Sequence, residues 1–191
     1  DLIFPKMQQV YAPALDDVTA HEFFLAANKV FKQPLRTEAD ELTYSLHIII
    51  RYEIEKGLFA GTLTTAGLDK VWNRKYKDYL GITVKDDREG ILQDVHWADS
   101  FGYFPVYAMG NGYNAAYGKL MDRAFATEGG LAGVIRAGRM DRVLAWMKDN
   151  VFAKANLLTA KEWTVAVTGR PLQCDDFIAY LDKKYTAIYD L

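Results

Sequence analysis

The sequence predicts an all-α protein, and three observations support this. Thr19 is followed three residues later by Glu22, and Thr159 by Glu162; in such a capping box each side chain can bond the other residue's backbone N–H at a helix start. Several segments repeat apolar residues at helical spacing. Strand patterns are few, and the best is the short segment 81–84 (GITV). Counting caps and periodic segments predicts about seven or eight helices.

The first capping box opens a predicted helix over residues 19–31, and the next predicted helix covers residues 37–59. This second helix carries two contrasting stripes. Its apolar stripe, expected to face the core, contains Leu42, Leu46 and Ile49. Its polar stripe, at spacings of four, three and four, contains Asp40, Tyr44, His47 and Arg51. The polar stripe is either a solvated row with ordinary ion pairs, or part of a helix buried on both sides, where it lines a cleft or forms an internal hydrogen-bond network.

Further helices follow in chain order. Thr65 is the expected N-cap of a helix that ends at Gly81, because glycine readily adopts the left-handed conformation found after helices. Residues 139–152 form the next predicted helix. Its apolar stripe contains Val143, Leu144, Met147 and Val151. The second capping box starts another helix, and Asp175 is the expected N-cap of the last one.

The composition limits the classes of function. The 191 residues suit one domain, and half of them are hydrophobic, so a sizeable core is expected. The net charge of −2 lacks the basic excess that nucleic acid or anionic lipid attracts, and no apolar run is long enough to span a membrane. The single cysteine, Cys174, excludes a disulfide framework and favours a reducing compartment. Because the chain starts without Met, it is expected to begin partway through a longer protein.

The sequence contains no recognisable metal site. Zinc needs three or four His, Cys or carboxylate ligands around one point, and the three histidines, His21, His47 and His96, lack ligand spacing. The segment HEFFL begins like the HExxH zinc signature but places Leu25 where the second His must stand. A G-x-S-x-G nucleophile motif is absent from the sequence, and Cys174 is expected to be a structural thiol.

The segment 90–97 (GILQDVHW) concentrates groups that are capable of chemistry. They are Gln93, Asp94, His96 and Trp97, and Tyr103 follows them. Asp94 or a backbone carbonyl could hold one nitrogen of His96 and leave the other free to donate, and Trp97 could wall a pocket. Two interpretations stay open, namely a helix-entry motif with a satisfied buried histidine, and a piece of an active site.

Two motifs resemble those of one enzyme family. LRTEAD (35–40) is similar to the motif Ile/Val-Arg-x-x-Ala-Asp, with Leu35 as a mild departure, and GILQDVHW matches Gly-x-x-Gln-Asp-x-His-Trp at every fixed position. With these motifs, and with similar sequence over nearly its whole length, the chain resembles the C-terminal part of the Taq-type metallocarboxypeptidases. The resemblance implies that residues 1–191 form the C-terminal helical portion of the catalytic domain. The implied fold is multi-helix and neurolysin-like, with a deep substrate groove.

The resemblance also implies an activity, a cofactor and partners. Family members remove C-terminal amino acids from peptides with zinc or cobalt, usually as cytoplasmic homodimers. Their metal ligands, the two His of HExxH and a Glu, belong upstream of Asp1, in an N-terminal part of the same polypeptide, as does their catalytic Glu. No cofactor and no metal ligand is therefore expected in this chain, which is expected to be inactive alone. Its expected partners are the N-terminal part and a peptide substrate, with no nucleic acid and no membrane.

The same resemblance assigns roles to individual residues. His96 is expected to hydrogen-bond the substrate or the tetrahedral intermediate, and either Tyr103 or Tyr107 is expected to assist it. The expected substrate-binding residues are Arg36, Asp40, Gln93, Asp94 and Trp97, among which the arginine limits the substrates that fit the groove. Two alternatives stay open, namely a stand-alone, non-catalytic helical peptide-binding module and a helical scaffold with a borrowed sequence.

Overall fold

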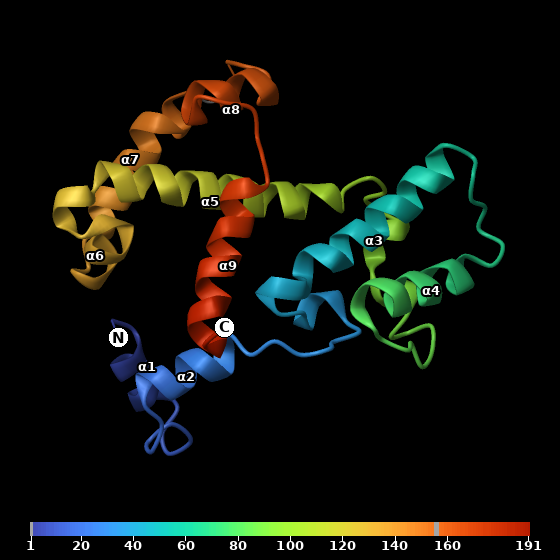
Figure 1. The fold of residues 1–191 in the computed structure, drawn as a ribbon, viewed down its shortest axis with the longest axis horizontal. Helices are drawn as coiled ribbons and strands as arrows, with labels where there is room; N and C mark the ends of the chain where they lie inside the picture. The colour runs from blue at the N-terminus through green and yellow to red at the C-terminus, as the bar shows by residue number, and fades with distance from the viewer. Residues whose placement is uncertain (1, 155–156) are drawn as a thin grey trace. The chain divides into compact units, whose positions relative to one another are not determined.

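The computed structural model describes residues 2–154 and 157–191, which form two compact helical units. One unit comprises Leu25–Gly110, and the other joins Asp1–Phe24 to Asn111–Leu191. Within the described residues the secondary structure consists of α-helices and short 3-10 turns without a strand, so the predicted all-α fold is confirmed (Figure 1). In chain order the helices are α1 (Phe4–Val10), α2 (Ala20–Ala27), α3 (Glu41–Phe59), α4 (Leu68–Leu80), α5 (Pro105–Ala124), α6 (Gly130–Arg136), α7 (Met140–Asn150), α8 (Ala160–Thr168) and α9 (Asp175–Tyr189).

Both predicted capping boxes form. At the start of α2, the N–H and Oγ1 of Thr19 donate to Glu22 Oε2 at 2.9 and 2.7 Å, and the Glu22 N–H donates to Thr19 Oγ1 at 3.2 Å. The same reciprocal bonds link Thr159 and Glu162 at the start of α8. Gly81, at φ +64°, ends α4 as predicted. The predicted helix ends are therefore confirmed where a local hydrogen bond or a glycine determines them.

Two other predicted caps are wrong. The helix α4 begins only at Leu68, after Gly67 in the left-handed conformation, and Thr65 contributes only its carbonyl oxygen, which accepts from the Leu68 N–H. The helix α9 begins at Asp175 itself, so this side chain lies in the first turn, one residue past the cap position of Cys174. Its charge there complements the positive end of the helix dipole without capping it.

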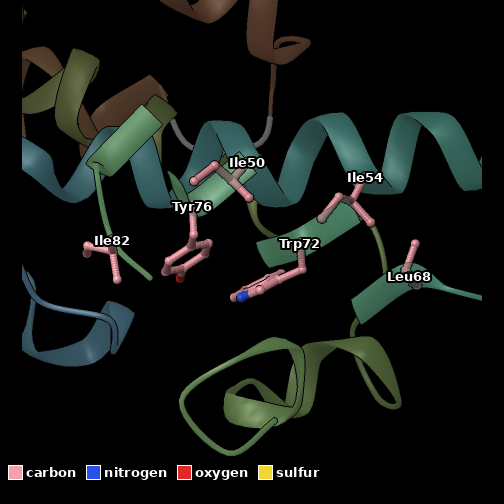
Figure 2. Packing of buried hydrophobic residues seen from close by; sticks show 6 residues of the cluster. All are labelled: Ile50, Ile54, Leu68, Trp72, Tyr76 and Ile82. Carbon is pink, nitrogen blue, oxygen red and sulfur yellow. The ribbon is translucent and has the colours of Figure 1, made fainter. Parts of the chain in front are cut away.

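The core of the Leu25–Gly110 unit includes side chains of α3 and α4 (Figure 2). Its buried members are Ile50, Ile54, Leu68, Trp72, Tyr76 and Ile82. The rings of Trp72 and Tyr76 stack with centroids 4.6 Å apart. Ile82 belongs to this cluster, and its N–H donates to the Tyr76 carbonyl at 3.2 Å. The weak strand pattern at 81–84 does not form a strand, because packing against helices outweighs the strand propensity of so short a segment.

The helix α3 buries a different face from the one predicted. Leu42 and Ile49 are 39% and 40% exposed, whereas Ile50 and Ile54 are fully buried. The prediction that Leu42 and Ile49 face the core is therefore wrong. The buried side of α3 also carries His47 and Arg51, both 0% exposed. This helix thus buries polar groups that need hydrogen-bond partners from other segments.

The other unit has its own core cluster, formed by side chains of α5 and α6 and of the residues that directly follow α5 and α7. Its buried members are Tyr117, Met121, Phe125, Val134 and Val151. From the stripe predicted for α7, Val143 and Met147 pack against this cluster and Val151 is buried, whereas Leu144 is 49% exposed. Across the described residues, no helix combines the length and the apolar character that crossing a bilayer requires.

Candidate functional site

The GILQDVHW segment contacts α3 through Asp94. The segment forms two short 3-10 turns, Ile91–Gln93 and Val95–Trp97, with Asp94 extended between them. The Asp94 residue is 7% exposed, and its carboxylate accepts hydrogen bonds from two guanidinium groups. Nη2 of Arg36 donates to Oδ1, and Nε of Arg51 donates to Oδ2, both at 2.6 Å. Two segments distant in sequence therefore meet on one carboxylate.

The two arginines decide the ionisation of Asp94. Burial alone would raise the pKa of Asp94, but the hydrogen bond from Arg36 and the charge of Arg51 outweigh it and leave that pKa below its ordinary value. The hydrogen bond to Asp94 in turn raises the pKa of Arg36. All three groups are therefore charged, and the cluster, which we call the Asp94 lock, contains two cations and one anion.

Gln93 joins the LRTEAD segment to the GILQDVHW segment. Its Oε1 accepts from the backbone N–H of Arg36 and from Nη2 of Arg51, both at 2.8 Å. Its amide nitrogen donates to the carbonyls of Pro34 and Glu89 at 3.0 and 2.8 Å. Two acceptor and two donor sites are all that a glutamine side chain has. Gln93 therefore uses its full hydrogen-bonding capacity inside this unit.

Part of the polar stripe of α3 forms an internal hydrogen-bond network, as one interpretation of its spacing expected, but the helix is not buried on both sides, because Leu42 and Ile49 are exposed. Nη1 of Arg51 donates to the His47 carbonyl at 2.9 Å and to the Tyr76 hydroxyl at 3.1 Å. The guanidinium carbon lies 4.6 Å from the centroid of the Trp72 ring, within cation–π range. The buried cation thus has polar partners at its edge and an aromatic face beside it.

The two residues at the N-terminal end of the stripe have different partners. The Tyr44 hydroxyl accepts from Nη1 of Arg36 at 3.2 Å, which links this tyrosine to the Asp94 lock. Asp40 is the N-cap of α3, and its carboxylate accepts from the N–H and Oγ1 of Thr43 at 3.0 and 2.9 Å. Asp40 therefore fixes the start of the helix that carries the network.

His47 is held neutral inside this network. One ring nitrogen, Nδ1, lies 3.1 Å from the Tyr76 hydroxyl in a hydrogen bond. Burial, followed by the nearby charge of Arg51, lowers the pKa of His47 from its ordinary 6.5 to about 4. A histidine of this kind is uncharged at neutral pH and takes up a proton in the folded state only in acid.

The lowered pKa of His47 predicts a loss of stability in acid. As pH falls, the unfolded chain takes up this proton near pH 6.5 and the folded chain only near pH 4, so stability is lost over that interval. The total is about 3 kcal/mol, since each pKa unit corresponds to about 1.4 kcal/mol. Urea unfolding between pH 7 and pH 4 should show a flatter pH dependence in His47→Gln than in the wild type. Burial raises the pKa of Glu55, which acts in the opposite direction, but both proteins retain Glu55. Parallel curves would contradict the prediction.

His96 lies in a cluster with two tyrosines. Its Nε2 is 3.0 Å from the Tyr107 hydroxyl, and one of these groups donates to the other. Its Nδ1 lies 3.5 Å from Asp94 Oδ1 but has no hydrogen-bond partner among the described residues. The Tyr103 ring stacks on the imidazole with centroids 5.9 Å apart, and Tyr103 is 47% exposed. The structure therefore brings the three predicted catalytic residues together, with Tyr103 the most accessible.

Trp97 turns toward the core of its unit. It packs against the buried α3–α4 cluster, and its ring meets those of Trp72 and Phe104 at centroid distances of 6.1 and 5.1 Å. Its indole N–H is buried and has no hydrogen-bond partner among the described residues. An indole N–H usually finds a partner when it is buried. Trp97 and His96 both pack against Phe104, so Trp97 serves as packing support within this unit.

Comparison with known proteins places this arrangement in a family. The family model described as carboxypeptidase Taq (M32) metallopeptidase matches residues 1–185. The chain belongs to this M32 family. It is 40% identical over 187 residues to thermostable carboxypeptidase 1 of Thermus thermophilus and 38% identical to carboxypeptidase 1 of Bacillus subtilis. Each alignment covers 97% of this chain but only 36% and 37% of the relative, so the M32 chain spans little more than a third of their length.

Solved structures agree with the family assignment. Trypanosoma cruzi metallocarboxypeptidase 1 superimposes on the M32 chain with a TM-score of 0.87 at 32% sequence identity. The match covers 96% of this chain and 38% of that structure. The helical arrangement described above is therefore the one found in part of a longer M32 protein.

M32 proteins are metallopeptidases, but the described part of this chain does not offer a metal site. Among residues 2–154 and 157–191, no group of three or more His, Cys, Asp or Glu side chains could hold a metal ion. His47 and His96 instead bond to tyrosine hydroxyls. The resemblance assigns the zinc or cobalt to ligands upstream of this chain, and not to the residues described here.

Two residues that bond this cluster were not identified from the sequence. Tyr76 bonds both His47 and Arg51, but in the sequence it is one more aromatic residue in an apolar stripe. Glu55 is 2% exposed, and its carboxyl group accepts a hydrogen bond from the backbone N–H of Gly102, the residue before Tyr103. It stands four residues after Arg51 and so continues the spacing of the polar stripe. Extending that stripe by one turn would have found it.

Proposed function

We propose that this chain forms the substrate-side wall of a metal-dependent carboxypeptidase that removes C-terminal amino acids from peptides. Membership of the M32 family supports a carboxypeptidase role. The observation that carries the proposal is the Asp94 lock, a buried and fully charged cluster directly beside His96, Tyr103 and Tyr107, of which Tyr103 is exposed. Such a rigid support is what a hydrogen-bonding catalytic group requires, because donors contribute most when their position is fixed before the reaction.

In this proposal His96 uses Nε2, the ring nitrogen beside the Tyr107 hydroxyl, to donate a hydrogen bond to the substrate's scissile carbonyl oxygen as that oxygen gains charge, because Nδ1 is buried. Tyr107 holds the imidazole through its hydroxyl, 3.0 Å from Nε2. Of the two tyrosines, Tyr103 suits direct contact with the substrate because it is 47% exposed, whereas Tyr107 is half-buried. The roles of the two phenols thus differ: one positions the histidine and the other faces the peptide.

The five proposed substrate-binding residues shape the same wall. Gln93 and Asp94 hold the segment, Asp40 caps the helix behind it, and Trp97 packs beneath it. Arg36 is 7% exposed, so its influence on the groove comes from its place in the lock together with its stack on Tyr107, 5.0 Å from the ring centroid. We propose that all five act mainly by fixing the wall's shape.

The remaining parts of the enzyme are proposed to lie outside this chain. The metal, zinc or cobalt, would be held by ligands in an N-terminal part of the same polypeptide, and it would supply the Lewis acidity that peptide hydrolysis requires. A homodimeric assembly and a cytoplasmic location belong to the same proposal. Relatives nearly three times as long as this chain are consistent with such a missing part.

This proposal predicts a difference between the chain and the complete protein. After dialysis, the isolated chain should retain less than one zinc ion per molecule and should not hydrolyse an N-blocked peptide. The complete protein should bind metal stoichiometrically and release the C-terminal amino acid. Metal analysis and a ninhydrin assay of released amino acids provide the measurements. Tight stoichiometric zinc in the isolated chain, or a complete protein that binds peptide without cleaving it, would contradict the proposal; the latter result would favour a non-catalytic binding module.

A further inference from the structure

Glu55 is a buried acid whose hydrogen-bond partner lies in a loop. It lies on α3, one turn after Arg51, and is 2% exposed. Its Oε1 accepts the backbone N–H of Gly102 at 2.6 Å. Its Oε2 is buried and has no hydrogen-bond partner among the described residues. The carboxyl group therefore connects α3 to the loop that precedes α5.

The loop makes a tight turn at this contact. The Tyr103 N–H donates to the Ser100 carbonyl at 3.1 Å, and Gly102, the third residue of the turn, has φ +87°. A turn of this kind needs glycine at its third position, and the internal bond leaves the third N–H unused. Glu55 accepts that N–H. The turn is further attached to α3 by Phe101, whose ring lies 5.0 Å from that of Phe59.

Tyr103 follows the anchored peptide directly. Its ring stacks on His96 at 5.9 Å and meets Tyr107 edge-on at 5.6 Å. A displacement of Gly102 would therefore move the phenol that the proposed mechanism places against the substrate, and would remove one face of the His96 packing. Misplacement of a reacting group by about 1 Å can lower a rate by about a hundredfold.

We propose that Glu55 is a positioning residue that fixes Tyr103, and through it His96, by accepting the Gly102 N–H. The inference rests on the carboxypeptidase function proposed above, and it adds a residue that the two family-like motifs do not contain.

The chemistry of the site indicates that Glu55 is needed as a hydrogen-bond acceptor for the Gly102 N–H. A carboxyl group without an adjacent cation is costly to bury, and an apolar side chain would occupy the same space at lower cost. Burial raises the pKa of Glu55, while the Gly102 N–H and the nearby His96 act in the opposite direction. Because an amide oxygen accepts a hydrogen bond as a carboxyl oxygen does, glutamine should preserve the contact with the Gly102 N–H, whether Glu55 is protonated or ionised in the wild type.

The test compares Glu55→Gln with Glu55→Met in the complete enzyme. Glu55→Gln should keep kcat within about twofold, whereas Glu55→Met should lower kcat roughly tenfold or more with little change in KM. In a Tyr103→Ala background, Glu55→Met should have little further effect on kcat, because its target is already gone. Glu53→Met, on the same helix but paired with Lys75 and half-exposed, is the matched control and should retain wild-type kcat.

Hydrogen exchange gives a reading that does not depend on activity. The Gly102 N–H should be protected in the wild type and in Glu55→Gln, and should exchange at least about tenfold faster in Glu55→Met.

If Glu55→Met yields little folded enzyme, Glu55→Leu replaces it, and protection of Gly102 in the wild type still decides whether the contact exists. Rapid exchange there, wild-type kcat in the folded Met variant, or equal damage from Gln and Met would overturn the inference. A wild-type enzyme without carboxypeptidase activity would refute the proposed function instead, while the exchange data would still report on the contact.

Discussion

Replacing Asp94 with asparagine is expected to lower the free energy of unfolding by about 3–5 kcal/mol, the range measured when one partner of a buried ion pair is removed. The side chains of Arg36, Arg51 and Asp94 are only 8%, 0% and 5% exposed. The substitution keeps the shape of the side chain but leaves two buried guanidiniums without an anion. Water cannot replace the lost charge at Arg51, which has no exposed surface. Urea unfolding at neutral pH measures the loss.

An exposed ion pair provides the control for this prediction. Asp86 bonds Arg88 at 3.2 Å, but the side chains are 47% and 90% exposed. Asp86→Asn should leave the urea midpoint unchanged, because water and salt screen such pairs. The same unfolding midpoint for Asp94→Asn and wild type would show that the lock does not hold the GILQDVHW segment. The positioning argument for His96 would then lose its support.

Local signals in the sequence predicted local structure well. The capping boxes at Thr19 and Thr159 each depend on residues three positions apart, and Gly81 ends α4 through its own backbone conformation. The predictions that Thr65 and Asp175 are N-caps were wrong because the signal was ambiguous. Several residues near a helix start can serve as a cap, and the choice among them depends on where the first turn packs.

The orientation of α3 could not be predicted from a pattern of polar and apolar residues. Its buried cation, Arg51, meets Asp94 43 residues later, and Arg36 reaches the same carboxylate across 58 residues. The rule that polar residues lie on the protein surface fails where buried polar groups hydrogen-bond to partners far away in the sequence. The spacing of Tyr44, His47 and Arg51 did show that the stripe was unusual, and the LRTEAD and GILQDVHW motifs named the segments that meet there. What the sequence lacked was the information that these features form one cluster.

His96→Ala in the complete enzyme is expected to lower kcat by about a hundredfold or more, the loss seen when one preorganised hydrogen-bond donor is removed. KM should change much less, because an interaction made mainly in the transition state appears in kcat and in kcat/KM together. Bound zinc should stay at the wild-type level, since His96 bonds Tyr107 and lies in no metal-binding group of the described residues. The melting temperature should change little, because the Asp94 lock holds the segment without the imidazole.

Two further variants separate a catalytic role from a structural one. Tyr107→Phe removes the hydroxyl 3.0 Å from Nε2 and should lower kcat in the same direction but by less, because the imidazole itself remains. His21→Ala alters an exposed histidine on α2 and should leave kcat, zinc content and melting unchanged. If His96 were only a packing residue among Phe104 and Tyr103, its loss would lower the melting temperature strongly and leave kcat nearly intact in the molecules that stay folded. Steady-state kinetics, metal analysis and thermal unfolding on the three variants therefore distinguish the roles, and a folded, zinc-loaded His96→Ala enzyme with near-normal kcat would remove His96 from the mechanism.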